Sequence, residues 1–229
     1  FEFVQSHLGA DDAIEPFGGT VNMRNLVLTG DADDSFDWVL GYEGNVQYVA
    51  IKKYNDLADR GIESDNLSAN NDSLPRSNPT LANFTIIGSE AASQGVLHRR
   101  GTAGRMANFV ITGFGGTCVD IDNDATWEQA QQGNLIYSNS VAIGCVGGTF
   151  DDSDFAVSSW WLDAGNLDAD PQVGGPNGTL LQAGSPAIGV GVVPFEDAFF
   201  DKVDFAGAFA PGAPDWTKGW TVGLDRDRP

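Results

Sequence analysis

Short runs of alternating apolar and polar residues recur along the first 150 residues of the chain. One series of acidic phrases is centred on an apolar residue, which is in turn Ile14, Phe36, Ile62, Leu97 and Val119. A second series of strand-like phrases begins at Asn25, Gln47, Asn83, Asn108 and Asn134. Successive phrases are 22, 26, 35 and 22 residues apart in the first series, and 22, 36, 25 and 26 in the second. The longest interval falls at the same place in both series. One insertion in the polar stretch 68–79, within a connection over about 64–80, explains both long intervals.

A repeat of this length with two short β phrases predicts a solenoid. Leucine-rich repeats have a similar length, but their leucine consensus is absent here, and helical repeats are longer. The pattern therefore predicts an all-β fold, a right-handed parallel β-helix of 22–26-residue coils over residues 1–150. The asparagines that open four of the phrases, Asn25, Asn83, Asn108 and Asn134, are expected at bends, where asparagine tolerates a left-handed backbone.

The repeat fades after residue 150. Residues 151–229 are predicted to hold the final coil or coils and an irregular, aromatic-rich segment that caps the open end of the coils. The aromatic residues expected in this cap are Trp160, Trp161, Phe199, Phe200, Phe205, Phe209, Trp216 and Trp220. The alternative is a sugar-binding platform of exposed rings, for which the candidates are Trp160, Trp161, Trp216 and Trp220. We favour the cap, because aromatic residues spaced this densely usually pack together.

In the predicted register Glu15, Asp37, Glu63, His98 and Asp120 form one column along the coils. Carboxylates one strand spacing apart repel each other unless water, cationic side chains or a bound cation offset their charge. The column is therefore open to three interpretations: a solvated face with interleaved arginines, a Ca²⁺ site, or a catalytic site.

Each of the last two interpretations names its own residues. The expected Ca²⁺ ligands come from two acidic clusters and are Asp31, Asp33, Asp34 and Asp37, with Asp120, Asp122 and Asp124. The spacing of neither cluster matches an EF-hand loop, so such a site would be non-standard. A catalytic site would use Asp37 and Glu63 on adjacent coils, with Arg60 or Arg100 as the basic partner, to cleave a polysaccharide.

The charge and the cysteine content of the chain limit its expected partners and its expected cellular location. The chain has 32 acidic and 12 basic residues and a formal charge of −20, which argues against nucleic acid or an anionic membrane as partner. No run of about twenty apolar residues is present, so no transmembrane segment is predicted. Cys118 and Cys145 are 27 residues apart, about one coil, and are predicted to form a disulfide, which favours an extracellular location. Because the chain begins at Phe1 and not at Met, we interpret it as a mature or trimmed fragment that has lost an export signal.

Parts of the sequence also resemble known proteins. The phrase "LLQAGSPAIGVG" resembles the closing phrase of many secreted bacterial right-handed β-helix proteins. The phrases "DDAIEPFGGTVNMRNLVLTGDADDSFDWVLGYEGNVQY" and "VDFAGAFAPGAPDWTKGWT" resemble a group of largely uncharacterised bacterial secreted or cell-surface proteins, many of them described as lipoproteins. The resemblance implies the fold and export, but no reaction. Pectate lyases and polygalacturonases are similar in architecture alone, since the polygalacturonase phrases Asn-Thr-Asp, Gly-His-Gly and Arg-Ile-Lys are absent.

These observations predict a non-catalytic extracellular or cell-surface protein with a structural, adhesive or glycan-contacting role, stabilised by Ca²⁺. A polysaccharide or another cell-surface component is the expected partner. Two alternatives remain: a polysaccharide lyase or glycoside hydrolase that uses carboxylates on adjacent coils, and a filament subunit that self-associates through the ends of its coils.

Overall fold

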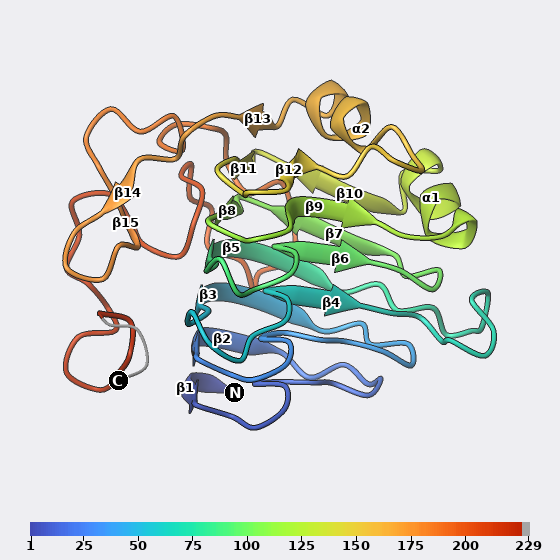
Figure 1. Ribbon diagram of the computed structural model, residues 1–229, viewed down its shortest axis with the longest axis horizontal. Helices are drawn as coiled ribbons and strands as arrows, with labels where there is room; N and C mark the ends of the chain where they lie inside the picture. The colour runs from blue at the N-terminus through green and yellow to red at the C-terminus, as the bar shows by residue number, and fades with distance from the viewer. Residues whose placement is uncertain (226–229) are drawn as a thin grey trace.

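The structure is a computed structural model that describes residues 1–225, and it is built from stacked coils of parallel strands (Figure 1). The strands of the coils are β1 (Glu2–His7), β2 (Met23–Thr29), β3 (Asn45–Lys52), β4 (Ile62–Ser64), β5 (Thr80–Ile87), β6 (Val96–His98), β7 (Gly104–Ala107), β8 (Val110–Thr112), β9 (Thr117–Ile121), β10 (Leu135–Ser138), β11 (Val141–Ala142), β12 (Gly148–Phe150) and β13 (Leu167–Asp168). Helix α1 (Asp124–Gln131) lies between β9 and β10, and α2 (Val157–Asp163) lies between β12 and β13. A small antiparallel pair, β14 (Val173–Gly174) and β15 (Leu180–Leu181), follows the coils.

The chain alternates between two parallel sheets. The long sheet has the order β1-β2-β3-β5-β8-β11-β13; β7 also pairs with β5, and β10 pairs with β7. The second sheet has the order β12-β9-β6-β4. Isolated bridges from Ile14 to Phe36 and from Phe36 to Ile62 extend the second sheet to the first two coils. The prediction of an all-β fold with parallel strands is confirmed.

The register of the second sheet differs from the predicted one by one residue at the fourth coil. Ile62 pairs with Val96, and Val96 pairs with Val119, so Val96 and not Leu97 occupies the inward apolar position. Two apolar residues stand side by side there, and alternation alone does not decide which of them points inward. The prediction that His98 belongs to the acidic column is therefore wrong.

His98 lies inside the coil. Its side chain is fully buried, with Nδ1 2.6 Å from the Ser64 hydroxyl and Nε2 3.0 Å from the Tyr137 hydroxyl. Burial lowers the pKa of His98 to about 3, so its imidazole is neutral and serves the interior packing.

A column of residues with left-handed backbone bends the long sheet. It consists of Phe3, Asn25, Tyr48, Asn83, Asn108 and Asn139, whose φ angles lie between 54° and 63°. The expectation of asparagine at these bends is confirmed for Asn25, Asn83 and Asn108. It is wrong for Asn134, because α1 lengthens that coil and Asn139 takes the position instead.

Inward side chains stack into columns that fill the coils. Leu28, Ile51, Ile86 and Ile111 are aligned by the strand pairings and are fully buried. The rings of Phe84 and Phe109 stack with their centroids 4.5 Å apart. The predicted disulfide is present: Cys118 and Cys145 are bonded, with Cα atoms 5.5 Å apart.

The aromatic C-terminal segment covers a flank of the coils, not their end. In Figure 1 it runs along the outer face of the long sheet and returns toward β1. The sheet presents small residues there, including Ala50 and Ala82, which leave room for Phe209 and Phe200 respectively. Asn83 donates hydrogen bonds to the carbonyls of Phe205 and Gly207 at 3.0 and 3.1 Å. The end cap predicted from these aromatic residues is wrong for Phe200, Phe205, Phe209, Trp216 and Trp220, which pack against this flank or bond to it.

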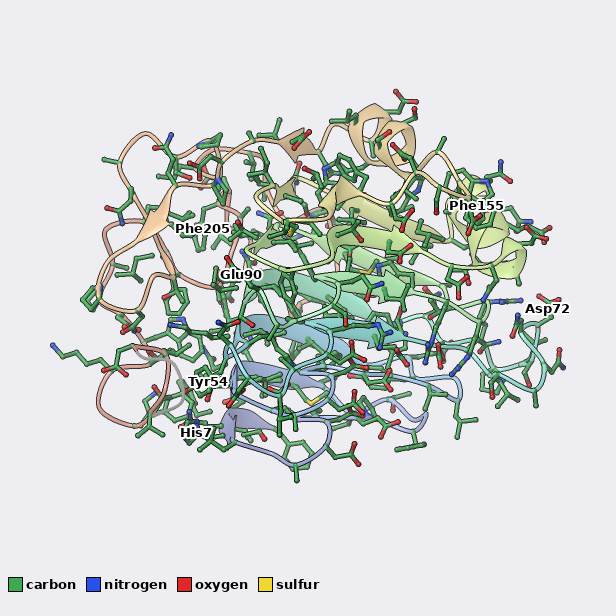
Figure 2. All side chains as sticks on the ribbon, viewed as in Figure 1. His7, Tyr54, Asp72, Glu90, Phe155 and Phe205 are labelled. Atoms are coloured by element: carbon green, nitrogen blue, oxygen red, sulfur yellow. A yellow bond between two sulfur atoms is a disulfide. The ribbon has the colours of Figure 1, made fainter. Side chains whose placement is uncertain are left out.

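The insertion predicted near residues 64–80 forms a loop between β4 and β5. Asp72, labelled in Figure 2, lies at its outer end, on the opposite side of the coils from the C-terminal segment. Asn66 fastens the base of the loop, because its side chain donates to the carbonyls of Asn71 and Ser73, both at 2.9 Å.

The first coil is open. Within the described residues β1 pairs with β2 alone, and Phe1 and Phe3 are 76% and 57% exposed. A hollow of about 320 Å³ beside them is lined mainly by apolar side chains, including Val4 and Ile14. Self-association through coil ends stays a prediction.

Candidate functional site

The outer face of the second sheet carries a row of acidic side chains. The pairings of Ile14 with Phe36 and of Phe36 with Ile62 place Glu15, Asp37 and Glu63, which follow them, on adjacent coils. Glu63 pairs directly with Leu97, and Leu97 pairs with Asp120. The row is therefore Glu15, Asp37, Glu63, Leu97 and Asp120, and Leu97 occupies the position predicted for His98.

Asp34, Asp37 and Glu63 converge at the centre of this row. One carboxylate oxygen of each lies within 4.8 Å of the others, and the three residues are 4%, 7% and 6% exposed. Asp12, Glu15 and Asp37 form a second convergent group on the preceding coils. We call Asp12, Asp34, Asp37 and Glu63 the carboxylate ladder.

Asp37 is the one member of the ladder whose side chain has no hydrogen-bonding partner in the described part of the chain. The backbone N–H of Asp34 donates to Asp12 at 2.9 Å, and that of Arg60 donates to Asp34 at 2.8 Å. The Oδ1 atom of Asp37 is buried and has no donor. A buried carboxylate oxygen without a donor carries a large desolvation cost unless a proton or a cation binds it.

Burial and mutual repulsion raise the pKa values of the ladder. The pKa of Asp37 is raised to about 9, first by burial and then by the charge of Glu63. Burial is also the main cause that raises the pKa values of Asp12, Asp34 and Glu63 to about 7 each. Without a cation the ladder therefore holds protons at neutral pH.

Two arginines offset part of the ladder's charge. Arg60 forms ion pairs with Asp59 at 2.6 Å and with Glu63 at 2.8 Å. Arg99 pairs with Glu63, and with Asp65 at 3.1 Å. Arg100, the other basic residue of the catalytic interpretation, pairs with Asp65 and not with Glu63. Asp37, Glu63 and Arg60 are thus brought together, and Arg99 takes the place expected for Arg100.

The predicted Ca²⁺ ligands separate into different environments. Asp34 and Asp37 lie in the ladder, and Asp33 lies at its exposed edge near Asp11 and Asp12. Asp31 does not join them: its buried carboxylate pairs with Lys53 and accepts a hydrogen bond from Ser35 at 2.9 Å. Lys53, on the next coil, neutralises the Asp31 carboxylate. The assignment of Asp31 as a Ca²⁺ ligand is therefore wrong.

The second predicted cluster lies further along the same face. Asp120 and Asp122 line a hollow of about 230 Å³, together with Arg60, Gln94 and Leu97. Asp124 instead begins α1 and is exposed. Within residues 1–225 no convergent group of three metal-binding side chains contains Asp120, Asp122 or Asp124.

The tryptophans do not form a common platform. Trp161 is fully buried, and Trp160 packs edge-on against Tyr137 in the main core. Trp216 stacks on Phe209 and donates its indole N–H to Ala208 at 2.8 Å, while Trp220 packs on the same flank. The four rings lie in two separate places, and each is engaged in packing, so they do not present one common surface to a sugar.

A sequence profile described as a pectate-lyase-like β-helix domain matches residues 1–166. The chain belongs to this β-helix family. No curated protein and no solved structure matches the chain. The residues that match the pectate-lyase-like β-helix family include the whole carboxylate ladder and the hollow beside it. Neither helix in residues 1–225 of this β-helix protein is long and apolar enough to cross a membrane.

The ladder of this β-helix protein fits a hard divalent cation. Ca²⁺ takes oxygen ligands, and Asp34, Asp37 and Glu63 supply converging carboxylate oxygens, one of which has no other partner. Two contributors were missed from the sequence. Asp12 precedes Asp34 by 22 residues, the spacing of the first repeat, which was an available signal, whereas Arg99 follows only from the corrected register.

Proposed function

We propose that this protein is a non-catalytic extracellular β-helix module that binds Ca²⁺ at Asp34, Asp37 and Glu63 and contacts glycans on the same face. The observation that carries the proposal is the buried Asp37 carboxylate, whose Oδ1 lacks a donor within the described chain and converges with two other acids. Burial and then the charge of Glu63 raise the pKa of Asp37, and a cation at this point would offset both.

An extracellular location is supported by the disulfide. Bonds of this kind persist in oxidising compartments and are rare in the reducing cytosol. The Cys118–Cys145 bond joins neighbouring coils and leaves no free cysteine among residues 1–225.

The arginines near the ladder argue against β-elimination. A lyase needs a basic side chain that accepts a proton, and an arginine must first lose its own. Burial lowers the pKa of Arg99, but the charges of Asp65 and Glu63 outweigh it, so the pKa is raised above the ordinary value. Arg60 is likewise engaged with Asp59 and Glu63. Both guanidinium groups are thus better placed to neutralise carboxylates than to accept protons.

The Asp37→Asn variant tests the cation site. Calorimetric titration should show Ca²⁺ binding to the protein and at least about tenfold weaker binding to the variant, because a neutral amide replaces a charged ligand. The control is Asp163→Asn, which removes the same charge from the exposed end of α2. Equal Ca²⁺ affinity in Asp37→Asn and Asp163→Asn would contradict the proposal, and so would no Ca²⁺ binding at all.

A second candidate function is cleavage of a polysaccharide, and the match to a pectate-lyase-like domain favours it. Asp37 and Glu63 would be the acting carboxylates, with Arg60 or Arg99 beside them. Incubation with acidic and neutral polysaccharides, followed by assays for reducing ends and for ultraviolet absorbance of unsaturated uronates, distinguishes the two functions. Turnover that disappears in both Asp37→Asn and Glu63→Gln would replace the non-catalytic proposal.

A further inference from the structure

The first coil exposes side chains that belong to the inward columns of the fold. In the column that begins at Val4, the next residues along the strand pairings are Leu26, Val49 and Phe84. These three side chains are fully buried, whereas Val4 is 36% exposed, and Phe1 beside it is 76% exposed. The first coil therefore presents to solvent the surface that each later coil buries against its neighbour.

This surface combines an apolar hollow with an unpaired strand edge. Apart from Glu15, the side chains that line the hollow of about 320 Å³ are apolar, and they include Val4 and Ile14. Within the described residues β1 pairs with β2 alone, so the other edge of β1 has backbone groups without a partner strand. An exposed strand edge beside apolar side chains is a surface that another strand can extend.

Helix α2 closes the opposite end of the coils (Figure 1). Val157 and Trp161 of this helix are fully buried in the main core. The Trp161 ring centroid lies 5.0 Å from that of Tyr137 and 6.0 Å from that of Phe150, which belong to the last strands of the coils. A second copy of the chain can therefore offer an open coil face only at its own first coil. Contact between two such faces is isologous, with a twofold axis.

The exposed apolar area is of the size that a dimer needs. Phe1, Phe3 and Phe17 all belong to the first coil and are 76%, 57% and 64% exposed. Their exposed parts amount to roughly 300–500 Å² in each copy. Two copies would thus bury roughly 600–1,000 Å² from these rings alone, against the roughly 1,200–2,000 Å² of a stable interface. The hollow and the edge of β1 supply further area.

We propose that two copies of this chain associate through their first coils, with their β1 strands antiparallel across a twofold axis. The inference is independent of the Ca²⁺ and glycan proposals. Because each copy uses its open end, the contact closes on itself and gives a dimer, not the filament considered from the sequence. Both copies bring the same acidic residues to the contact, Glu15 among them, so screening by salt should strengthen the dimer.

Analytical ultracentrifugation of the chain in chelator tests the dimer. Concentrations up to about 0.1 mM suffice, since a Kd of about 1 µM would leave most of the protein associated. Phe1→Asp should weaken the dimer at least about tenfold, because it places a charge in the contact. Its exposed ring makes little contribution to folding, which a melting curve checks. Val4→Asp, inside the hollow, should weaken the dimer further.

Two matched controls place an aspartate on other exposed apolar positions. Leu74→Asp lies on the loop between β4 and β5, and Leu162→Asp lies on α2 at the closed end. Both should dimerise like the parent protein.

Three results would overturn the inference. The first is a monomer at every concentration and salt. The second is a dimer that neither Phe1→Asp nor Val4→Asp weakens, which would place the contact elsewhere. The third is a series of larger species that Leu162→Asp abolishes, which would show stacking of first coils on last coils.

Discussion

Replacement of Lys53 by methionine is expected to lower the free energy of unfolding by about 3–5 kcal/mol, the usual cost of removing one partner of a buried ion pair. Lys53 and Asp31 are both fully buried, and the lysine ammonium group pairs with the carboxylate. The same ammonium group donates to the backbone carbonyls of Asp31, at 3.3 Å, and of Asp33. Methionine fills a similar volume but leaves the buried Asp31 carboxylate without a cationic partner, with the Ser35 hydroxyl as its remaining donor.

Thermal and denaturant unfolding measure this effect. A loss of this size corresponds to a melting temperature lower by about 10 °C in a chain of this length. The double variant Asp31→Asn with Lys53→Met should recover most of the stability, because neither charge remains. Lys218→Met, at an exposed position, serves as the matched control and should change stability by less than about 0.5 kcal/mol. A loss below about 1 kcal/mol in Lys53→Met would show that the pair is not the buried contact described here.

The coil repeat was predictable, because one inward apolar residue recurs in every coil. The register was ambiguous only where Val96 and Leu97 stand together, and that single slip moved His98 into the acidic row and exchanged Arg100 for Arg99. A register error of one residue moves every side chain of a strand to the opposite face of the sheet. The prediction of site residues is therefore more sensitive to such an error than the prediction of the fold.

Contacts between coils were harder to infer. Asp31 lies in the acidic run "GDADD", which has the composition of an exposed loop, and nothing near it in the sequence indicates Lys53. The sequence contains a weak indication that the C-terminal segment covers this flank, because Ala50 and Ala82 are small residues in strands that otherwise hold large ones. Aromatic density alone identified a packed segment but not the surface against which it packs.

Without Ca²⁺, the free energy of unfolding is expected to fall as the pH rises from about 4 to about 9. Asp34 and Glu63 have pKa values raised to about 7, and Asp37 to about 9, whereas in the unfolded chain they ionise near pH 4. Between these values the folded state binds more protons than the unfolded state, so each rise in pH favours unfolding. Above the folded pKa values this contribution has been lost and the dependence should flatten.

Ca²⁺ should reverse this loss, because it binds the ionised carboxylates and takes the place of their protons. At a Ca²⁺ concentration about 100 times Kd the stabilisation is about 2.7 kcal/mol, which raises the melting temperature by about 5–10 °C. The rise should be largest near pH 8 and nearly absent near pH 5, where the ladder holds protons. Melting curves across this range, in chelator and in Ca²⁺ at matched ionic strength, measure both effects.

Asp37→Asn separates the ladder from the overall charge of −20, which also destabilises the folded state as the pH rises. The variant lacks the group with the highest raised pKa, so in chelator it should be more stable than the parent protein at pH 8 and should respond little to Ca²⁺. Asp163→Asn changes the net charge equally and should keep the parent's response. If Asp37→Asn kept the full Ca²⁺-dependent rise in melting temperature at pH 8, the ion would be binding elsewhere on the acidic surface. The buried Asp37 carboxyl group would then be tolerated in the fold only because it is protonated.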